Sequence, residues 1–489
     1  MSEFTVDNSL VRLGAPYSQA CLPTSVPAPQ WIAFNTELAA QLALPKHYWQ
    51  TDTGLALFSG NNLPDWVQSA AHAYAGHQFG HFVPQLGDGR ALLLAEVLDE
   101  TGQRFDIQLK GAGRTPFSRR GDGRAPLGPV LREYLVSEAM HALGVPTTRA
   151  LAAVLTGDWL QRDTAEPGAI ITRVAKSHIR IGSFQYIAEH GDIEQLKTFA
   201  DYVINRHYPH CAASNTPYLA LLESVVEAQA NLIAKWMSLG FIHGVMNTDN
   251  MSIAGETIDY GPCAFMDSFN PAQVFSFIDK QGRYAWGNQP RIGSWNLARL
   301  TECLLPLINP QQELAVAEAT AVLQKFSTLN ETAFLQLMAA KIGLQQATAA
   351  DEVLIRDYLH LMSEDKADFT LAFRLLSQSV SDINVGAAQL FGDKQAWQSW
   401  AERWQLRLAE QAINATEVQQ QMDSTNPAVI ARNHQIANAI EQATAQGDLT
   451  LFNRLHKALA TPFTLAKANA DLGLAPNAEQ CIANTFCGT

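Results

Sequence analysis

The most regular alternation of hydrophobic and polar residues runs from Arg104 to Lys110. Phe105, Ile107 and Leu109 are apolar, and the positions that follow each of them carry Asp106, Gln108 and Lys110. A period of two predicts a β-strand with one apolar and one polar face. The apolar run Ala91–Leu98 precedes it across a turn that ends in Gly102, so these two segments predict a hairpin.

Other segments have the patterns of helices and of further strands. Pro129 fits the first turn of a helix that runs to about Leu143 and is closed by Gly144. A long apolar helix is predicted from Tyr218 to Leu239, ending at Gly240. The remaining predictions are a short helix at Trp31–Leu42, strands at Ala150–Leu160 and Ala169–Val174, a buried helix at Trp295–Leu307, and successive helices from Gln311 to Ala470.

The composition is that of a folded chain with a large core. Of 489 residues, 47% are hydrophobic and 17% are charged, and this length predicts two or more lobes. The net charge of −13 argues against non-specific nucleic-acid binding. We see no secretory signal and no apolar run long enough to span a bilayer, so a cytoplasmic location is expected. Six cysteines without a Cys-x-x-Cys motif indicate neither a disulfide scaffold nor a zinc site.

A polar loop from His243 to Gly261 carries the candidate metal chemistry. Asp249, Asn250 and Asp259 offer the hard oxygen ligands that Mg²⁺ prefers, and Mg²⁺ takes only one or two such ligands from protein where phosphates supply others. The alternative is a plain polar turn before a short apolar strand, with Asp and Asn chosen for their turn geometry.

The spacing within this loop resembles that of protein kinases, where His-Arg-Asp-x-x-x-x-Asn and a later Asp-Phe-Gly hold the metals. Here Asn250 lies seven residues after His243, and Asp259 begins an Asp-Tyr-Gly sequence. Val245 occupies the position of the kinase catalytic Asp and cannot accept a proton. Asp249 is therefore the nearest replacement carboxylate.

Glycines and basic residues flank the predicted hairpin. Gly87 and Gly89 lack side chains, so backbone N–H groups there can approach a phosphate closely. Lys110 ends the second strand as the kinase strand lysine does, although a solvated lysine is the alternative. The segment Gly111–Gly128 holds four arginines and five glycines, which favours an anion site over a flexible basic loop.

A second basic cluster follows the later strands, and it consists of Arg173, Lys176, His178 and Arg180. This cluster is consistent with phosphate contacts. In the helix that begins near Pro129, either Glu133 or Glu138 is a candidate partner for Lys110. They are five residues apart and so lie on different helix faces, and either is equally a surface glutamate.

Three histidines, His72, His77 and His81, lie close together in the sequence. Gly76 and Gly80 argue against a regular helix that would align them. We therefore favour structural roles for these histidines over a metal site.

Seven longer motifs carry a resemblance to a known family, and they are Tyr74–His81, Gln85–Arg90, Gln108–Arg124, Arg132–Glu133, Arg173 with Ser177–Arg180, His243–Met251 and Asp259–Pro262. A chain with these motifs resembles the selenoprotein O family of pseudokinases. The resemblance is strong from about residue 70 to 300 and weaker to the C-terminus. Motifs of this length are far more specific than a lone Gly-x-Gly.

The resemblance implies an α+β, protein-kinase-like, two-lobed fold, with a β-rich N-lobe that holds one key helix and a larger, mostly helical C-lobe. We divide the chain into an N-terminal extension (1–70), an N-lobe with the nucleotide-binding loops (71–175), a C-lobe with the catalytic and metal loop (176–400), and a C-terminal helical extension with a Cys-containing tail (401–489).

The resemblance also implies a protein adenylyltransferase. In this family ATP binds in an inverted orientation relative to kinases, so the α-phosphate faces a protein hydroxyl. AMP then passes to Ser, Thr or Tyr and pyrophosphate leaves. The basic loop, with Arg173 and Arg180, supplies the cations that an inverted triphosphate requires.

Carried over residue by residue, the resemblance assigns a role to each candidate in this chain. Lys110, Arg173 and Arg180 hold phosphates, and Glu133 pairs with Lys110. Asn250 and Asp259 bind Mg²⁺, with Mn²⁺ as the alternative metal, and Asp259 also contacts ATP. Asp249 is the general base. The residues implied to line the nucleotide pocket are Gly87, Gly89, Arg90, Asp122 and Gly123.

The resemblance also implies a disulfide that responds to redox conditions. Some family members carry selenocysteine near the C-terminus, where this chain has Cys487. The resemblance to bacterial-type members implies a reversible disulfide between Cys487 and Cys263, which follows the Asp-Tyr-Gly turn. Two free thiols are the alternative, and Cys481 is a rival partner.

Two other function classes stay open. A protein kinase is opposed by Val245 at the usual base position. A non-catalytic nucleotide-binding scaffold is opposed by the intact set of Lys110, Asn250 and Asp259. The expected partners are ATP and proteins with Ser, Thr or Tyr acceptors, without nucleic acid or membrane, and we expect a monomer.

Overall fold

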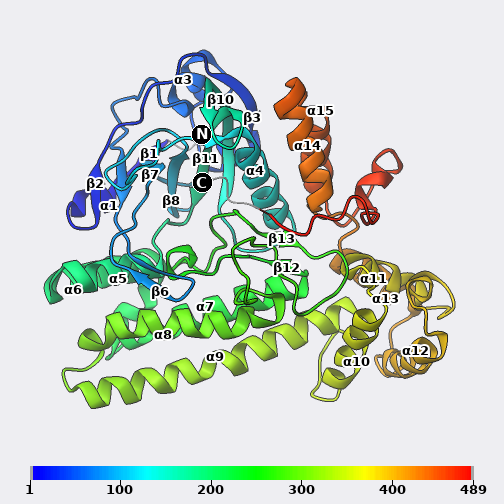
Figure 1. The fold of residues 1–489 in the computed structure, drawn as a ribbon. Helices are drawn as coiled ribbons and strands as arrows, with labels where there is room; N and C mark the ends of the chain where they lie inside the picture. Colours follow the sequence, from blue (N-terminus) through cyan, green and yellow to red (C-terminus); the bar gives the residue numbers. More distant parts are fainter. Residues whose placement is uncertain (1–3, 486–489) are drawn as a thin grey trace.

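Strands gather at one end of the molecule and helices fill most of the other end (Figure 1). The structure is a computed structural model that describes residues 4–485. Nine strands form one sheet with the order β2-β4-β7-β8-β11-β10-β3, while β1 pairs with β7 and β9 pairs with β11. All of these neighbours run antiparallel. The coarse prediction of an α+β fold is confirmed, and the structure has a large antiparallel sheet and many helices.

The strands of this sheet are β1 (Thr5–Val6), β2 (Ser18–Ala20), β3 (Gln30–Phe34), β4 (Ala70–His72), β7 (Ala91–Leu98), β8 (Arg104–Lys110), β9 (Ala125–Pro126), β10 (Arg149–Gln161) and β11 (Ala165–Ala175). Two short pairs lie outside it, β5 (Gly76–Gln78) with β6 (His81–Val83), and β12 (Phe241–Ile242) with β13 (Ala264–Phe265). The predicted hairpin is confirmed, since β7 and β8 have the expected bounds and pair antiparallel.

The described helices are α1 (Ser9–Leu13), α2 (Thr36–Gln41), α3 (Asp52–Phe58), α4 (Leu127–Ala142), α5 (Ile181–His190), α6 (Ile193–His207), α7 (Pro217–Ser238), α8 (Gln289–Ile308), α9 (Gln312–Lys341), α10 (Asp351–Glu364), α11 (Phe369–Leu376), α12 (Lys394–Ala409), α13 (Ala415–Thr425), α14 (Asn433–Gln446) and α15 (Thr450–Leu459). The predicted helices near Pro129, Tyr218 and Trp295 are confirmed as α4, α7 and α8. No described helix has the length and apolar character required to cross a membrane.

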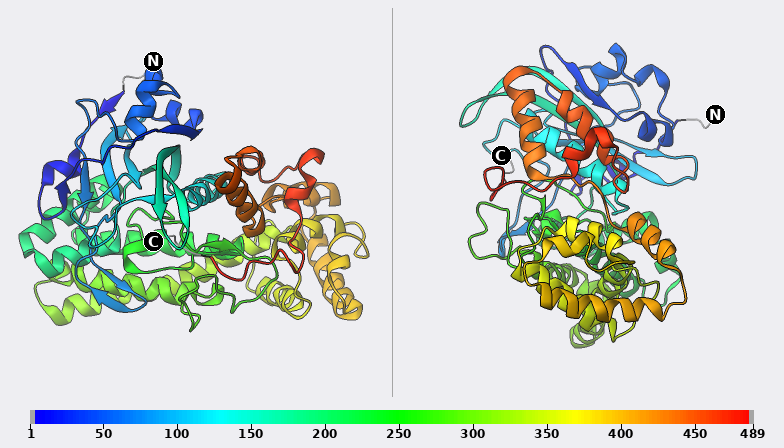
Figure 2. Two further views of the ribbon diagram at one scale, coloured as in Figure 1. Left: turned by 45° about the horizontal axis from the view of Figure 1, so that its top comes forward. Right: turned by 90° about the vertical axis from the view of Figure 1, so that its right-hand side faces the viewer.

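The helix α4 is buried on nearly every side. It packs against β10 and β11, and α14 and α15 pack against it as well. Figures 1 and 2 show these two C-terminal helices beside α4, although α4 lies much earlier in the sequence. A helix covered on both sides needs apolar residues around most of its circumference, as α4 has. Its few buried polar side chains are therefore candidates for specific contacts.

The helical end of the molecule is built on α7, α8 and α9, which pack against one another. The helix α7 ends at Ser238, and the chain turns through Gly240 (φ +69°) into β12 and the loop after it. A residue in the left-handed region just after a helix favours glycine, because glycine has no Cβ to clash. The apolar helix α7 thus leads directly into the candidate loop, which lies next to the sheet.

Two local predictions are wrong. The segment Trp31–Leu42 begins as a strand, because β3 pairs with β10 at the sheet edge, and only its second half is the helix α2. Asn35 caps that helix by accepting a hydrogen bond from Leu38 N at 3.0 Å. No strand forms in the described loop between Asn250 and Asp259, where only isolated bridges occur.

Candidate active site

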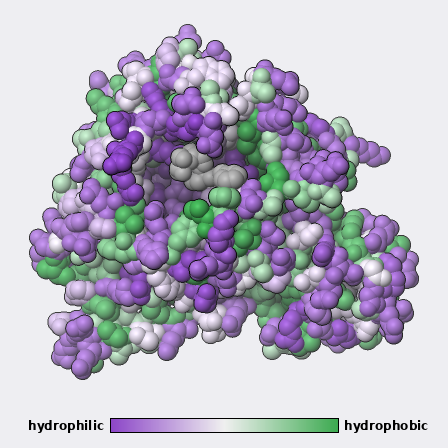
Figure 3. All heavy atoms as spheres, viewed as in Figure 1, coloured by the Kyte–Doolittle hydropathy of each residue, from purple (hydrophilic) through white to green (hydrophobic). Residues whose placement is uncertain are grey.

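A cavity of about 770 Å³ lies where the sheet meets the helical end of the molecule. The face seen in Figure 3 is hollowed, with mostly hydrophilic residues around the hollow. Of the predicted site residues, those that line the cavity are Gly89, Arg90, Lys110, Asp122, Gly123, Arg173, Arg180, Asn250 and Asp259. The structure therefore brings together residues that are up to 170 positions apart in the sequence (259 minus 89).

Asp259 lies at the centre of a cluster of cations. Its Oδ1 is 3.2 Å from Lys110 Nζ and 2.8 Å from Arg173 Nη1, and its Oδ2 is 3.0 Å from Arg180 Nη1. Burial opposes ionisation, but the three positive charges outweigh it and hold the pKa of the Asp259 carboxyl well below its usual range. Asp259 is therefore ionised at neutral pH, and three cations face one carboxylate.

Glu133, and not Glu138, is the partner of Lys110. Glu133 Oε2 accepts a hydrogen bond from Lys110 Nζ at 2.7 Å, and its Oε1 is 3.3 Å from Arg173 Nη1. Glu138 lies on another face of α4, where it pairs with Arg149 at 2.8 Å. In the structure Lys110 thus has the partner that the family resemblance implied, whereas the residue pattern by itself had left both glutamates open.

Arg180 is held firmly and keeps a donor free for a ligand. Its Nη1 donates to the backbone oxygen of Asp249 at 2.8 Å, and its guanidinium carbon lies 4.5 Å from the centre of the Tyr74 ring. A cation over an aromatic face is stabilised by the ring's charge distribution. Arg180 Nη2 is buried and has no hydrogen-bond partner among the described residues. This unsatisfied donor suits an anionic ligand.

Asp249 and Asn250 lie side by side in a 3-10 turn, Thr248–Asn250, but have different surroundings. Asn250 lines the cavity and donates its Nδ2 to Val245 O at 3.0 Å, which leaves its amide oxygen for other contacts. Asp249 is 6% exposed and does not line the cavity. Burial is the main cause that raises the pKa of Asp249 to about 6.

The carboxylate of Asp249 is covered by the hairpin β5–β6. Gln78 Nε2 lies 3.5 Å from Asp249 Oδ2, and Asp249 Oδ1 has no hydrogen-bond partner among the described residues. The same hairpin holds the preceding residues of the turn, since His77 N donates to Thr248 Oγ1 at 2.7 Å and Phe79 N donates to Asn247 Oδ1 at 3.0 Å.

The glycines of the predicted phosphate loops have different reasons to be glycine. A Cβ on Gly87 (φ +78°) would lie 2.2 Å from the Phe117 ring, and Gly87 is not among the residues that line the cavity. A Cβ on Gly123 (φ +71°) would lie 2.0 Å from the Gly113 oxygen. Packing of loop against loop therefore requires both glycines, while Gly89 borders the cavity itself.

Comparisons with known proteins agree with this constellation. The model of the family described as "Protein adenylyltransferase SelO" matches residues 1–460. A relative from Rhodopseudomonas palustris named "Protein nucleotidyltransferase YdiU" is 51% identical over 490 aligned residues, covering 100% of both chains. Relatives of the same name from Rhizobium meliloti (52% identical, 100% of both chains) and Bacillus cytotoxicus (51% identical, 99% of this chain and 97% of the relative) match as fully.

The chain belongs to the SelO family. The suspected resemblance is confirmed, and the chain is an enzyme of the nucleotidyltransferase class.

Several cavity residues of this SelO-family chain were missed from the sequence. Arg162, in the turn between β10 and β11, pairs with Asp122 at 2.8 Å and lines the cavity. A single arginine in a polar turn carries no local signal. Tyr74 and Asp88 also line the cavity, and both lie within or next to the motifs quoted above, which was the available signal.

The donor set fits Mg²⁺ or Mn²⁺. Asn250 offers an amide oxygen and Asp259 an ionised carboxylate, and both line the cavity. Among the described residues there is no group of three or more His, Cys, Asp or Glu side chains that would hold a metal without other ligands. Mg²⁺ commonly takes only one or two oxygen ligands from protein and the others from phosphates and water, so two oxygen donors beside a cluster of cations suit such a site.

The remaining predictions concern histidines and cysteines. His77 has a structural contact, since its Nδ1 lies 2.8 Å from Gln185 Nε2, and His72 is buried 3.9 Å from Asp88. Cys263 is buried, whereas Cys487 lies outside the described residues, so their pairing stays a prediction. Thr485 donates its hydroxyl to Pro262 O at 2.6 Å, so the described end of the chain reaches the segment beside Cys263.

Proposed function

We propose that this SelO-family enzyme transfers AMP from ATP to Ser, Thr or Tyr hydroxyls of proteins and releases pyrophosphate. The observation that carries the proposal is the cluster of Lys110, Arg173 and Arg180 around Asp259 in the cavity. These three cations share two carboxylates, Asp259 and Glu133, so positive charge is in excess, and the negative charge of a triphosphate would balance it. The family description and the names of the relatives support nucleotidyl transfer to protein.

The kinase-like interpretation of the fold is part of the proposal. The Lys110–Glu133 pair between β8 and α4 corresponds to the strand lysine and helix glutamate of kinases. Asn250 and Asp259 take the positions of the two metal-binding residues. We propose on these grounds two kinase-like lobes, with the extensions and boundaries given above.

Inverted binding of ATP is supported by where the positive charge lies. Arg119, Arg120, Arg124 and Arg162 line the cavity together with the inner cations. Guanidinium groups match phosphate oxygens in geometry and charge, whereas an adenine ring has no negative charge for them to balance. A cavity with basic residues at both its inner and outer parts therefore favours a triphosphate that extends along it.

In the proposed site Asn250 and Asp259 hold the metal, which when bound neutralises phosphate charge. Lys110, Arg173 and Arg180 orient the phosphates and stabilise charge on the departing pyrophosphate. The acceptor oxygen forms a bond to the α-phosphorus while the bond from that phosphorus to the bridging oxygen of pyrophosphate breaks. Asp249 is buried under the hairpin β5–β6, next to the cavity-lining Asn250, so the acceptor side chain must reach beneath the hairpin for Asp249 to take the hydroxyl proton. A general base placed in this way contributes about 10²- to 10⁴-fold.

The first prediction concerns AMP transfer itself. Incubation with ATP, Mg²⁺ and a mixture of soluble bacterial proteins should add AMP to protein, detected by mass spectrometry and by label from α-³²P-ATP but not γ-³²P-ATP. Asp259→Ala should abolish the label, because it removes a metal ligand and the centre of the cation cluster. The exposed Asp65→Ala is the matched control and should label as wild type does.

Other results would overturn the proposal in distinct ways. Label from γ-³²P-ATP would indicate a kinase despite Val245. No label from either nucleotide, with ATP binding detected by calorimetry, would indicate a nucleotide-binding scaffold.

A further inference from the structure

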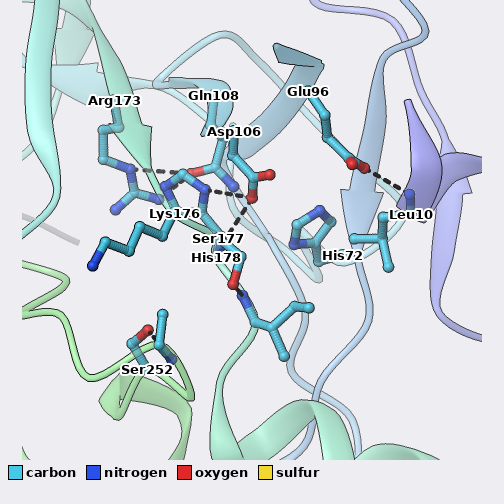
Figure 4. A network of polar contacts seen from close by, with 12 residues as sticks. Leu10, His72, Glu96, Asp106, Gln108, Arg173, Lys176, Ser177, His178 and Ser252 are labelled. Atoms are coloured by element: carbon cyan, nitrogen blue, oxygen red, sulfur yellow. Dashed lines mark hydrogen bonds and ion pairs between the residues drawn. The ribbon is translucent and has the colours of Figure 1, made fainter. Parts of the chain in front are cut away.

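The polar face of β8 carries four side chains, and they are those of Arg104, Asp106, Gln108 and Lys110. The proposed function uses only Lys110. Asp106 and Gln108 alternate with it along the strand, and both are 0% exposed. A buried polar group is costly unless it is hydrogen-bonded, so each has partners that explain its presence. Figure 4 shows Gln108 directed toward Arg173, and Asp106 toward His178.

The side-chain amide of Gln108 can make its hydrogen bonds in only one orientation. Its Oε1 accepts from Arg173 Nε at 3.0 Å and also from Arg173 Nη2, and its Nε2 donates to Asp88 Oδ2 at 3.0 Å. An arginine offers only donors and an ionised carboxylate only acceptors, so the amide cannot be reversed without losing these bonds. The orientation of Gln108 is therefore set by its two neighbours.

This contact determines which edge of the Arg173 guanidinium faces the cavity. Gln108 occupies Nε and Nη2, so Nη1 is the nitrogen that reaches Asp259 Oδ1 at 2.8 Å and Glu133 Oε1 at 3.3 Å. Because a guanidinium is planar and rigid, a partner on one edge orients the other edge. Arg173 and Gln108 face each other across β11 and β8, so sheet register maintains the contact.

Asp106 acts similarly one step further along the strand. It accepts hydrogen bonds from His178 N at 2.8 Å and from Arg206 Nη2 at 2.6 Å. Arg180 Nε in turn donates to His178 O at 3.2 Å. Alternate residues of β8 thus each support one cation of the cluster: Lys110 belongs to it, Gln108 contacts Arg173, and Asp106 holds the segment that carries Arg180.

We propose that Gln108 is a positioning residue for nucleotidyl transfer: it holds the Arg173 guanidinium so that Nη1 faces Asp259 and the phosphate site. The inference deepens the proposed function and rests on it, since Arg173 must contact the phosphates of ATP. Gln108 does not itself line the cavity, so its effect on the reaction passes through Arg173.

The test is a double-mutant cycle with Gln108→Met and Arg173→Met. Methionine keeps the length of glutamine and removes the acceptor. Gln108→Met should lower kcat/KM for ATP in AMP transfer by about 10- to 100-fold, as expected for a misplaced binding group. In the Arg173→Met background the same change should cost less than about twofold, because the group it positions is already gone.

Thr172→Val is the matched control. Thr172 lies on β11 beside Arg173, is 1% exposed, and its hydroxyl has no hydrogen-bond partner among the described residues. This nearly isosteric change in the same sheet should leave kcat/KM within about twofold of wild type. The melting temperatures of Gln108→Met and Thr172→Val show whether either variant is poorly folded.

Two results would overturn the inference while leaving the proposed function intact. One is wild-type kcat/KM in a folded Gln108→Met variant. The other is a loss of the same size in both backgrounds, which would mean that Gln108 supports the sheet and not Arg173. If Gln108→Met does not fold, the comparison is made with Asp88→Asn in both variants, because Gln108 donates to Asp88 and a glutamate there would repel its carboxylate. Gln108→Glu keeps the acceptor on Arg173 and should retain more activity than Gln108→Leu in that background; equal activity of these two would also overturn the inference. Absence of AMP transfer by wild type would instead count against the proposed function.

Discussion

Gly76 lies so close to Asp249 that one added carbon would displace the carboxylate. A Cβ built on Gly76 falls 2.3 Å from Asp249 Oδ1 and 2.8 Å from its Cγ. Real Cβ atoms do not approach other atoms this closely, so the Asp249 side chain or the hairpin β5–β6 would have to move. The absence of a side chain at position 76 is therefore part of how Asp249 is placed.

Gly76→Ala should lower kcat for AMP transfer by about 10- to 100-fold, because a shift of about 1 Å in a reacting group has this effect. The dissociation constant of ATP should change by less than about threefold, because Asp249 does not line the cavity. Initial rates at saturating ATP and calorimetric titration measure the two quantities separately.

Gly392→Ala is the control for this change. Its Cβ would also approach a carboxylate, Asp365 Oδ1 at 3.0 Å, but in an exposed turn. It should keep the wild-type kcat. An unchanged kcat in Gly76→Ala would show that the proton acceptor does not depend on the hairpin.

At the scale of elements, the end of α9 packs against α11 through a buried lysine. Lys341 is 4% exposed, and its ammonium lies 4.4 Å from the centre of the Phe373 ring and 5.6 Å from that of Phe369. Burial lowers the pKa of Lys341 from its ordinary value of 10.5 to about 7. The aromatic faces stabilise the cation only in part.

Lys341→Met should therefore raise stability most at low pH. The cost of burying the charged lysine is fully present below about pH 7 and is lost as pH rises toward 10.5, since the unfolded chain keeps its proton over that range. The melting temperature of the variant should exceed that of wild type clearly at pH 6 and by much less at pH 9.5. A pH-independent difference would mean that Lys341 has the same pKa in the folded and the unfolded chain, so that burial does not shift it.

The helix α12 buries three tryptophans along one side. Trp397, Trp400 and Trp404 recur at helical spacing, and all three are at most 3% exposed. Each indole N–H donates to a backbone oxygen, for example Trp404 Nε1 to Ile342 O at 2.7 Å. This stripe of tryptophans therefore lies in the core, and the hydrogen bonds explain how large polar-tipped rings are accommodated there.

At the scale of the whole molecule, Arg432 joins three distant parts of the chain. It is 0% exposed and pairs with Asp267 at 2.6 Å and with Asp368 at 2.8 Å. Asp267 follows β13, Asp368 caps α11, and Arg432 itself precedes α14. These two ion pairs thus link the helices that pack against α4 to the chain segment that follows the candidate site.

Arg432→Leu should lower stability by about 3–5 kcal/mol, because the buried Asp368 and the half-buried Asp267 would lose the cation that they share. Differential scanning calorimetry should show a melting temperature several degrees lower. Lys197→Met removes the exposed Lys197–Asp201 pair and should leave the melting temperature unchanged. Similar melting temperatures for both variants would mean that the carboxylates are hydrated or protonated without Arg432.

The sequence by itself determined the elements whose patterns are local. β7 and β8 follow from alternation and a glycine turn, and α4 and α7 from apolar spacing and their end signals, all of which depend on neighbouring residues. The candidate residues around the cavity followed from motif spacing and from the family resemblance. Where a strand pairing intervened, as at β3, local propensity was overridden, because sheet hydrogen bonds come from residues far away in sequence.

Tertiary structure alone decided which of these residues meet. Residue pattern does not distinguish Glu133 from Glu138, although the family resemblance implied Glu133, and the packing of α4 on β10 and β11 brings Glu133 to Lys110. The cover of hairpin β5–β6 over Asp249, and the contact of Gln108 with Arg173, likewise depend on the order of strands and on burial. The spacing of residues in the sequence predicts on which face of a helix or strand a side chain lies. Which residue it contacts there depends on how the whole chain packs.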